Sequence, residues 1–301
     1  MKLNDLLPPM GFPRAQTYVS ADSHWTLGDT EQSYNASGGH HLYSADSITY
    51  HLNSSGYRCP EFSDGSLLRM ISIGCSYTYG VGLPQEALYH ERFAERLRRE
   101  VGVSVVNWNL GSGAISNNYI SRVLHFAVPQ LDPDLILIFF THASRREYIS
   151  ATNEVVKYRP NARDTDPAQR EIFRLQSKLS SEYDDQLSFF RDYKSIETLL
   201  TGRIWAYGFC NPIEIDGVVS HLNSAHRIRD YRIANAYRGI PDTARDHRHP
   251  GPRTHDNIYQ CFWDWFIQSK GFEEVGIRIS GRASRPSVAE RCLTIDDNSA
   301  N

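Results

Sequence analysis

The stretch LLRMISIGCSYTYGVG, residues 67–82, passes from an apolar run directly into small and polar residues. Its first half, residues 67–74, predicts a buried strand, and the residues that follow predict a sharp turn at the carboxyl end of that strand. Cys75 and Ser76 lie side by side in this turn, and both residue types serve as nucleophiles in enzymes. Which of them reacts, if either does, depends on what the rest of the chain supplies.

On both sides of this stretch the chain alternates between two kinds of element. Strands are predicted at 67–74, 103–110, 134–140 and 203–209, and helices at 86–101, 115–128 and 256–271, the last one ending at Gly271. This order is typical of βαβ units, so we expect an α/β fold: a three-layer α/β/α sandwich with a parallel sheet. The run LILIFF is apolar at every position, as in a strand covered on both faces.

Three flanking segments differ from this pattern. Residues 1–66 are rich in Tyr, Ser, Asn, Gly and His and contain short alternating pieces such as SITYHL, so we predict a small β-rich N-terminal extension. Residues 150–200 are polar and charged, with a loop-like start rich in Pro, Asp and Arg and a helix-like second half. We interpret them as an insertion beside the sheet, within a domain that spans 67–279. Residues 280–301 form a C-terminal tail of mixed polarity.

The composition excludes several classes of partner. The chain has 301 residues with 32 basic and 35 acidic side chains, and this balance gives no long-range field to attract nucleic acid or an anionic membrane. No stretch approaches the ~20 apolar residues of a membrane helix, and the first residues do not resemble a signal peptide. We therefore expect a cytoplasmic protein without a nucleic-acid or membrane partner; its oligomeric state stays open.

The five cysteines indicate neither disulfides nor a zinc knuckle. Their number is odd and no two are spaced as CxxC. We expect reduced, mostly buried thiols that behave as small hydrophobic side chains.

The residues with reactive chemistry lie where the predicted strands end. These junctions read GCSYTYG after the first strand, NLGSGAISN (109–117) after the second and THASRRE (141–147) after the third, and the polar cluster ARDHRHPGPRTH (244–255) precedes the last helix. A serine nucleophile needs a base, a group that orients the base, and backbone donors for the oxyanion. Ser76, His249, Asp246 three residues before it, and Gly113 offer these parts.

The order of these blocks resembles the GDSL, or SGNH, hydrolases. The segment YHLNSSGYRCPEF (50–62) also resembles the Asn-x-x-Gly-Tyr/Phe-Arg segment that precedes the first strand in longer members, so the resemblance spans about residues 45–270. It implies a flavodoxin-like fold and a serine esterase without a cofactor. It further implies that Ser76 is the nucleophile, that His249 is the base supported by Asp246, and that Gly113 is an oxyanion donor. Cys75 then stands where the family has an aspartate.

The third block departs from the family pattern. The family has an asparagine after the third strand that donates to the oxyanion, whereas this chain reads FFTHASRRE. His142 is nearest to that position, and two interpretations stay open: an oxyanion donor, or a histidine whose hydrogen bonds are structural. Arg145 is a candidate for binding an acidic group of the substrate, and Arg146 is expected to face solvent.

Alternatives remain for the site and for the function. Asp246, His247, His249 and His255 lie close enough in sequence for a metal site, which we do not favour; we expect His247 to face solvent and His255 to cap or begin the last helix. The favoured function is hydrolysis of a small-molecule or carbohydrate ester, for example removal of an acetyl group. An acyltransferase that uses the same serine, or a binding protein with weak turnover, is the alternative.

Overall fold

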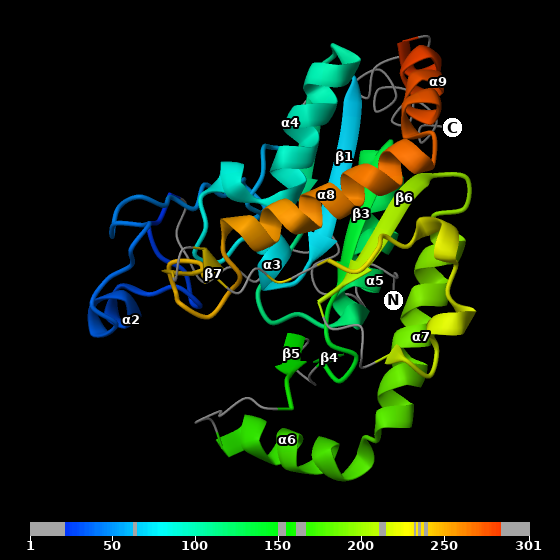
Figure 1. Ribbon diagram of the computed structural model, residues 1–301. Helices are drawn as coiled ribbons and strands as arrows, with labels where there is room; N and C mark the ends of the chain where they lie inside the picture. The colour runs from blue at the N-terminus through cyan, green and yellow to red at the C-terminus, as the bar shows by residue number, and fades with distance from the viewer. Residues whose placement is uncertain are drawn as a thin grey trace, which may run out of the picture.

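The structure, a computed structural model, describes residues 22–62, 65–149, 155–160, 167–210, 215–231, 233, 236–237 and 240–283. Its centre is a four-stranded sheet in the order β2-β1-β3-β6. The strands are β1 (Leu68–Gly74), β2 (Val105–Asn109), β3 (Leu135–Phe140) and β6 (Ile204–Phe209), and every neighbouring pair is parallel (Figure 1). The predicted parallel α/β sheet is confirmed.

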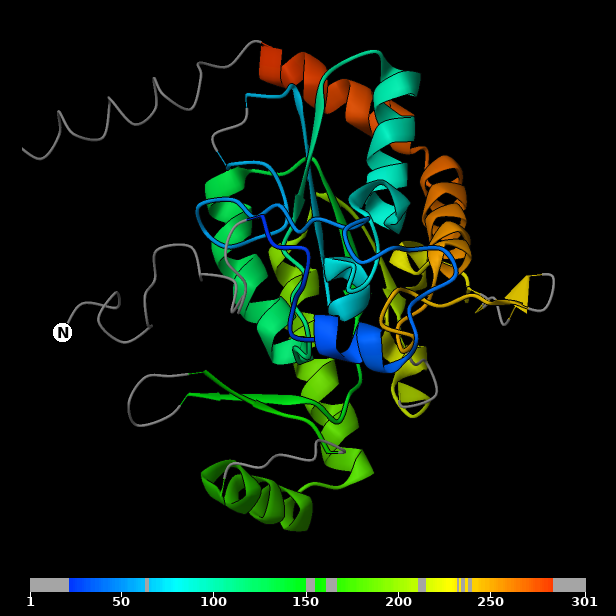
Figure 2. The same ribbon diagram turned by 90° about the vertical axis from the view of Figure 1, so that its left-hand side faces the viewer.

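Helices cover both faces of this sheet. On one face lie α4 (Tyr89–Val101) and α8 (Pro252–Gln268), and on the other lie α5 (Asn117–Leu131) and α7 (Glu182–Leu199) (Figures 1 and 2). Alternate residues of β3 belong to two separate cores: Leu135, Leu137 and Phe139 pack with α4 and α8, whereas Ile136, Ile138 and Phe140 pack with α5 and α7. The strand is apolar throughout because both faces are covered, and the three-layer sandwich is confirmed.

The strand order determines where a ligand has room. The chain leaves β1 through α4 on one face and enters β3 from α5 on the other, so connections diverge between the neighbouring strands β1 and β3. In open α/β sheets a crevice forms at such a switch point, outside the carboxyl ends of the strands. The short helix α3 (Ser76–Tyr79) begins at this end of β1.

The remaining elements are shorter or lie outside the sandwich. They are α2 (Glu31–Ala36), the 3₁₀ turns η1 (Gln85–Ala87), η3 (Val219–His221) and η4 (Ser224–His226), the hairpin β4 (Arg146–Ile149) and β5 (Val155–Tyr158), α6 (Pro167–Leu179), the pair β7 (Ala236–Tyr237) and β8 (Ile240–Pro241), and α9 (Gly271–Ala283). The β4–β5 hairpin lies beyond the carboxyl ends of the sheet strands (Figure 1). Within the described ranges no helix is long and apolar enough to cross a bilayer.

The prediction of a β-rich N-terminal extension is wrong for the residues that can be examined. In 22–62 extended pairing is limited to the isolated bridges Ser23–Tyr50 and Thr26–Asp29, and the regular element there is α2. The side chains of Ile48 and Tyr50 instead form a small apolar cluster with Tyr79 and Val81. The segment is held by side-chain contacts with the main domain, so it needs no sheet of its own; residues 1–21 lie outside the described part.

Two further boundaries differ from the prediction. The second half of the predicted insertion is α7, a layer of the sandwich, because Phe189, Tyr193 and Ile196 are buried on the face that it turns to the sheet. The last predicted helix ends at its C-cap Ser269, and Gly271 begins α9 instead of ending α8. Residues 280–283 of the predicted tail are therefore helical, and 284–301 lie outside the described residues.

Candidate active site

The turn after β1 presents Ser76 at the carboxyl end of the sheet. Cys75 is extended, with φ −78° and ψ −154°, and Ser76 is the first residue of α3 and half-buried. Gly74 is required before them, because a Cβ atom there would lie 2.7 Å from the backbone oxygen of Phe139. The chain can therefore bend sharply against β3 and leave the serine at the surface of the crevice.

The other side of this turn is held by a buried arginine. Arg58 donates to the carbonyl oxygens of Gly80 at 2.7 Å and Leu83 at 2.9 Å, and its side chain is fully buried. Asn53 shapes the segment before it by accepting from the N–H of Tyr57 at 2.9 Å. The Asn-x-x-Gly-Tyr-Arg segment thus supports the turn that follows the candidate nucleophile.

Asp246 and His249 form a close pair. The distance between His249 Nδ1 and Asp246 Oδ2 is 2.5 Å, with 22% of the His249 side chain exposed and only 1% of the Asp246 side chain. Burial raises the pKa of Asp246, but its hydrogen bonds and the charge of His249 outweigh burial and hold that pKa below its usual value. The carboxylate therefore stays ionised and fixes the orientation of the imidazole, as a triad requires.

The loop that carries this pair is docked on the nucleophile turn. The N–H of Arg245 donates to the carbonyl oxygen of Gly82 at 2.8 Å. Gly82 has φ +71°, and a Cβ atom there would lie 2.9 Å from both the Ala244 Cβ and the Arg245 nitrogen. The His249 ring meets the ring of Tyr77 edge-on, with 6.2 Å between centroids. Because Tyr77 follows Ser76 directly, the His249 ring lies beside the turn that carries Ser76.

A network of buried hydrogen bonds that no sequence motif indicated holds this loop in place. Asp29 accepts from the Arg245 guanidinium, at 2.7 Å from Nη2, and both side chains are fully buried. Tyr50 donates its hydroxyl proton to Asp29 at 2.8 Å and accepts from the N–H of Gly82 at 2.8 Å. The N-terminal segment, the nucleophile turn and the loop of His249 are thereby tied into one closed ring of hydrogen bonds.

The loop after β2 brings Gly113 to the same edge. The N–H of Ser112 donates to the carbonyl oxygen of Gly74 at 3.1 Å, and Gly111 lies so close to α3 that a Cβ atom would be 2.7 Å from the Tyr79 nitrogen. Gly113 itself is different, because a Cβ atom there would have no atom within 4 Å. Its flank is open, as an oxyanion donor needs for access to a substrate.

The third block, THASRRE, contains the predicted candidate His142 and is bound by a residue that was not predicted. His142 is half-buried, and its carbonyl oxygen accepts from the N–H of Arg145 at 3.2 Å; the role of its ring stays a prediction. The missed residue is Asn117, at the start of α5, whose side chain accepts from the N–H of Thr141 at 3.0 Å and donates to the carbonyl oxygen of Thr141 at 3.2 Å. This pair holds the Gly113 loop beside the end of β3.

The two arginines of that block have different surroundings. Arg145 is half-buried and reaches the Gly113 loop, where its Nη1 donates to Thr141 Oγ1 at 2.8 Å and to the carbonyl oxygen of Ile115 at 3.4 Å. The expectation that Arg146 faces solvent is wrong: it is buried and pairs with Asp185 at 2.6 Å. Arg146 therefore fastens the start of β4 to α7.

The histidine cluster does not form a metal centre within the described part of the chain. No group of three His, Cys, Asp or Glu side chains there has the geometry to hold an ion. His247 is exposed, as predicted. His255 is buried inside α8 instead of capping it, and burial lowers its pKa to about 3, while Asp242 caps the helix by accepting from the N–H of Thr254 at 2.8 Å.

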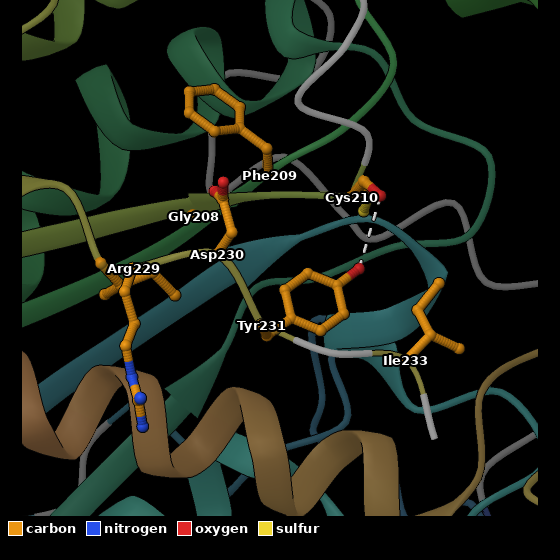
Figure 3. A pocket seen from close by; sticks show the side chains of 8 residues that line it. Gly208, Phe209, Cys210, Arg229, Asp230, Tyr231 and Ile233 are labelled. Carbon is orange, nitrogen blue, oxygen red and sulfur yellow. Dashed lines mark hydrogen bonds between the residues drawn. The ribbon is translucent and has the colours of Figure 1, made fainter. Parts of the chain in front are cut away.

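A cavity of about 180 Å³ lies on the β6 side of the crevice (Figure 3). Most of its lining is apolar, and the lining residues are Gly208, Phe209, Cys210, Ile228, Arg229, Asp230, Tyr231 and Ile233. Tyr231 donates to the carbonyl oxygen of Cys210 at 3.4 Å, and its ring packs against Phe139, which also stacks with Tyr77. The rings of Tyr231, Phe139 and Tyr77 therefore connect the lining of the cavity with the nucleophile turn.

Known proteins match this chain in structure but not in sequence. No family model and no curated protein matches the sequence. Solved structures do match, among them TesA, with 11% identity, 67% of this chain and 99% of that chain covered, and a TM-score of 0.42. A catalytic mutant of an acetylxylan esterase from Geobacillus stearothermophilus matches with 13% identity, 67% and 95% coverage and a TM-score of 0.41. A member of the lipolytic G-D-S-L family from Veillonella parvula matches with 14% identity, 66% and 98% coverage and a TM-score of 0.38.

The departure of this chain from the SGNH motif pattern at Cys75 has a structural counterpart, since the Cys75 and Cys210 sulfurs lie 3.3 Å apart. The hydrogen bond with Cys210, together with the charge of Arg145, lowers the pKa of Cys75 although burial opposes this. Only 2% of Cys75 is exposed and its side chain belongs to the core, whereas Ser76 is half-buried. Cys59 and Cys261 are buried as predicted, and Cys292 lies outside the described residues.

Proposed function

We propose that the protein is a serine ester hydrolase in which Ser76 is the nucleophile, His249 the general base and Asp246 the residue that orients the base. One observation carries most of the proposal: the 2.5 Å contact between Asp246 and His249 belongs to a loop that is hydrogen-bonded to the turn beginning at Ser76. A carboxylate, an imidazole and a hydroxyl at one edge of a parallel sheet are the parts that acyl transfer through serine requires.

The reaction proceeds in two displacements. Nε2 of His249 takes the proton of the Ser76 hydroxyl while Oγ attacks the carbonyl carbon of the ester, and Asp246 stabilises the imidazolium that forms. The N–H groups of Ser76 and Gly113 donate to the oxyanion. The bond from carbon to the alcohol oxygen then breaks and His249 returns its proton to the leaving alcohol. Water, activated by the same histidine, attacks the acyl-serine and releases the acid.

The acyl group that this site accepts is short. The cavity beside Cys210 is about 180 Å³, which is smaller than the ~300–1,000 Å³ of sites that enclose drug-sized ligands. Two of its lining residues lie close together, because a Cβ atom on Gly208 would lie 2.7 Å from the Ile228 side chain. An acetyl group fits such a volume, which favours deacetylation of a carbohydrate or a small metabolite.

A chain-length series tests both statements. Nitrophenyl acetate, butyrate and octanoate are compared by kcat/KM for the unaltered protein, Ser76→Ala and Tyr231→Ala. We expect the acetate to be the best substrate, Ser76→Ala to abolish turnover, and Tyr231→Ala to improve the octanoate relative to the acetate by enlarging the cavity. Folded protein that hydrolyses none of the esters, or Ser76→Ala protein that retains the rate, would contradict the proposed reaction. A preference for octanoate would contradict the short acyl group alone.

A further inference from the structure

Two cationic side chains converge on the Gly113 loop without an acidic partner. Arg145 donates to the carbonyl oxygen of Ile115, and Lys157 of β5 donates from Nζ to the carbonyl oxygen of Gly113 at 3.0 Å. Neither forms an ion pair with a carboxylate of the residues that the structure describes. The loop expected to supply an oxyanion donor is thus flanked by two positive charges.

The nearest carboxylate on the hairpin is already occupied. Glu147 of β4 stands opposite Lys157 in the hairpin register. Both of its oxygens, however, accept from Arg122, at 2.7 Å from Nε and 3.0 Å from Nη2. This bidentate ion pair neutralises the charge of Glu147, so the hairpin and the Gly113 loop together carry an excess of positive charge.

Burial makes this excess of positive charge unfavourable. Desolvation and the charges of three arginines, Arg159, Arg122 and Arg145, together lower the pKa of Lys157 to about 8, although Glu147 opposes them. Partly buried cations of this kind are stabilised when an anion binds between them. The arrangement therefore favours a ligand that brings its own negative charge.

The proposed binding of the ester determines which part of it meets these cations. The cavity proposed for the acyl group lies at the end of β6, and the Gly113 loop follows β2 at the opposite edge of the sheet. Ser76 follows β1, which lies between them. An ester whose acyl group enters the cavity and whose carbonyl carbon meets Ser76 directs its alcohol portion toward Gly113, Arg145 and Lys157.

We propose that Arg145 and Lys157 bind an anionic group, a carboxylate or a phosphate, on the alcohol portion of the substrate. This inference rests on the proposed ester hydrolysis and specifies its substrate class as short-chain acyl esters of anionic alcohols. Lys157 is a binding residue that the sequence pattern did not reveal, because it lies in a polar segment far from the family's blocks.

Matched aryl acetates measure this preference. The substrates are the charged esters 4-acetoxybenzoate and 4-acetoxyphenyl phosphate and the neutral ester methyl 4-acetoxybenzoate. They are assayed with the full chain and with the variants Arg145→Ala, Lys157→Met and Lys157→Arg. The control variant is Lys178→Ala, which removes an exposed positive charge on α6. We expect the unaltered protein to prefer at least one charged acetate by roughly tenfold in kcat/KM, since a hydrogen bond to a charged group contributes about 1.5–3 kcal/mol. The ratio of kcat/KM for the charged acetate to kcat/KM for the neutral acetate should fall toward one in Arg145→Ala and Lys157→Met. It should remain high in Lys157→Arg and Lys178→Ala.

The outcomes separate this inference from the function on which it rests. Hydrolysis of all three acetates without a charge preference would overturn the inference and leave the hydrolase intact. A preference for nitrophenyl hemisuccinate over nitrophenyl butyrate that disappears in Lys157→Met would place the anion on the acyl side and would also overturn it. The absence of turnover on every ester would contradict the hydrolase itself, and the inference with it. The carboxylate and phosphate arms identify which anion is bound.

Discussion

Removal of the Asp29 carboxylate tests whether the N-terminal segment positions the catalytic loop. In Asp29→Ala the Arg245 guanidinium keeps its charge but loses its only buried counter-ion among the described residues, and the Tyr50 hydroxyl loses its acceptor. Both partners of the ion pair are fully buried, and breaking such a pair by removing one side costs about 3–5 kcal/mol. For a chain of this size the corresponding fall in Tm is of order 10 °C.

The same substitution should also slow the reaction. Without the pair, the contact of Arg245 with Gly82 loosens and His249 moves relative to Ser76. A displacement of about 1 Å at a reacting group costs roughly a hundredfold in rate. We expect this loss in kcat for nitrophenyl acetate at a temperature well below the Tm of the variant.

Urea unfolding, calorimetry and the ester assay measure these effects, with Asp256→Ala as the control. That control breaks the half-exposed pair between Arg92 and Asp256 and should cost less than about 1 kcal/mol. The double variant Asp29→Ala with Arg245→Met should lose less stability than the sum of the two single variants, because no buried charge is left unpaired. If Asp29→Ala is as stable and as active as Asp256→Ala, the network does not hold the catalytic loop.

Three further outcomes follow from the site. Asp246→Asn should keep the fold and lower kcat by up to about 10⁴-fold, because an amide cannot hold the imidazole in the required tautomer; a loss below tenfold would contradict this role. His142→Ala should lower kcat by roughly a hundredfold with little change in KM if the ring donates to the oxyanion, and His142→Asn should recover part of it; unchanged kinetics with a lower Tm would make His142 structural. Burial lowers the pKa of His255 to about 3 in the folded protein, whereas the same side chain in the unfolded chain binds a proton near pH 6.5. The stabilisation by neutral His255 is therefore fully present above pH 6.5, and the free energy of unfolding should decrease by up to about 1.4 kcal/mol per pH unit as the pH falls from 6.5 toward 3. The substitution His255→Gln should flatten this slope, which urea unfolding at several pH values measures.

The sequence predicted the sheet well because its strands are strongly apolar. Residues 67–74, 134–140 and 203–209 match β1, β3 and β6 closely, since a strand covered on both faces leaves a continuous apolar run. The place of helix α7 in the sandwich was missed because its buried residues, such as Phe189 and Tyr193, are interspersed with many charged ones. Its place in the sandwich depends on contacts with aromatic residues of β3 and β6, such as Phe140, which local periodicity does not reveal.

Local sequence patterns could not predict the contacts that support the site, because these contacts join distant parts of the chain. Asp29 and Arg245 are 216 residues apart, so their pairing appears only once the chain is folded. The block order indicated Ser76, Asp246 and His249. Tyr50 and Asn117 lie within quoted motifs but had no assigned role there, and Lys157 lies outside the motifs. The sequence therefore predicted the reactive groups, and the structure showed which residues hold the loops that carry them.

The most direct test of the account is the site of covalent labelling by a fluorophosphonate. The unaltered protein, Cys75→Ala and Ser76→Ala are treated with the probe, digested and examined by tandem mass spectrometry. We expect one adduct, on the Ser76 oxygen, that forms in Cys75→Ala, is absent in Ser76→Ala and is strongly reduced in His249→Ala, since the base activates the hydroxyl. An adduct on Cys75, or labelling that persists in Ser76→Ala, would contradict the assignment of Ser76 as the nucleophile.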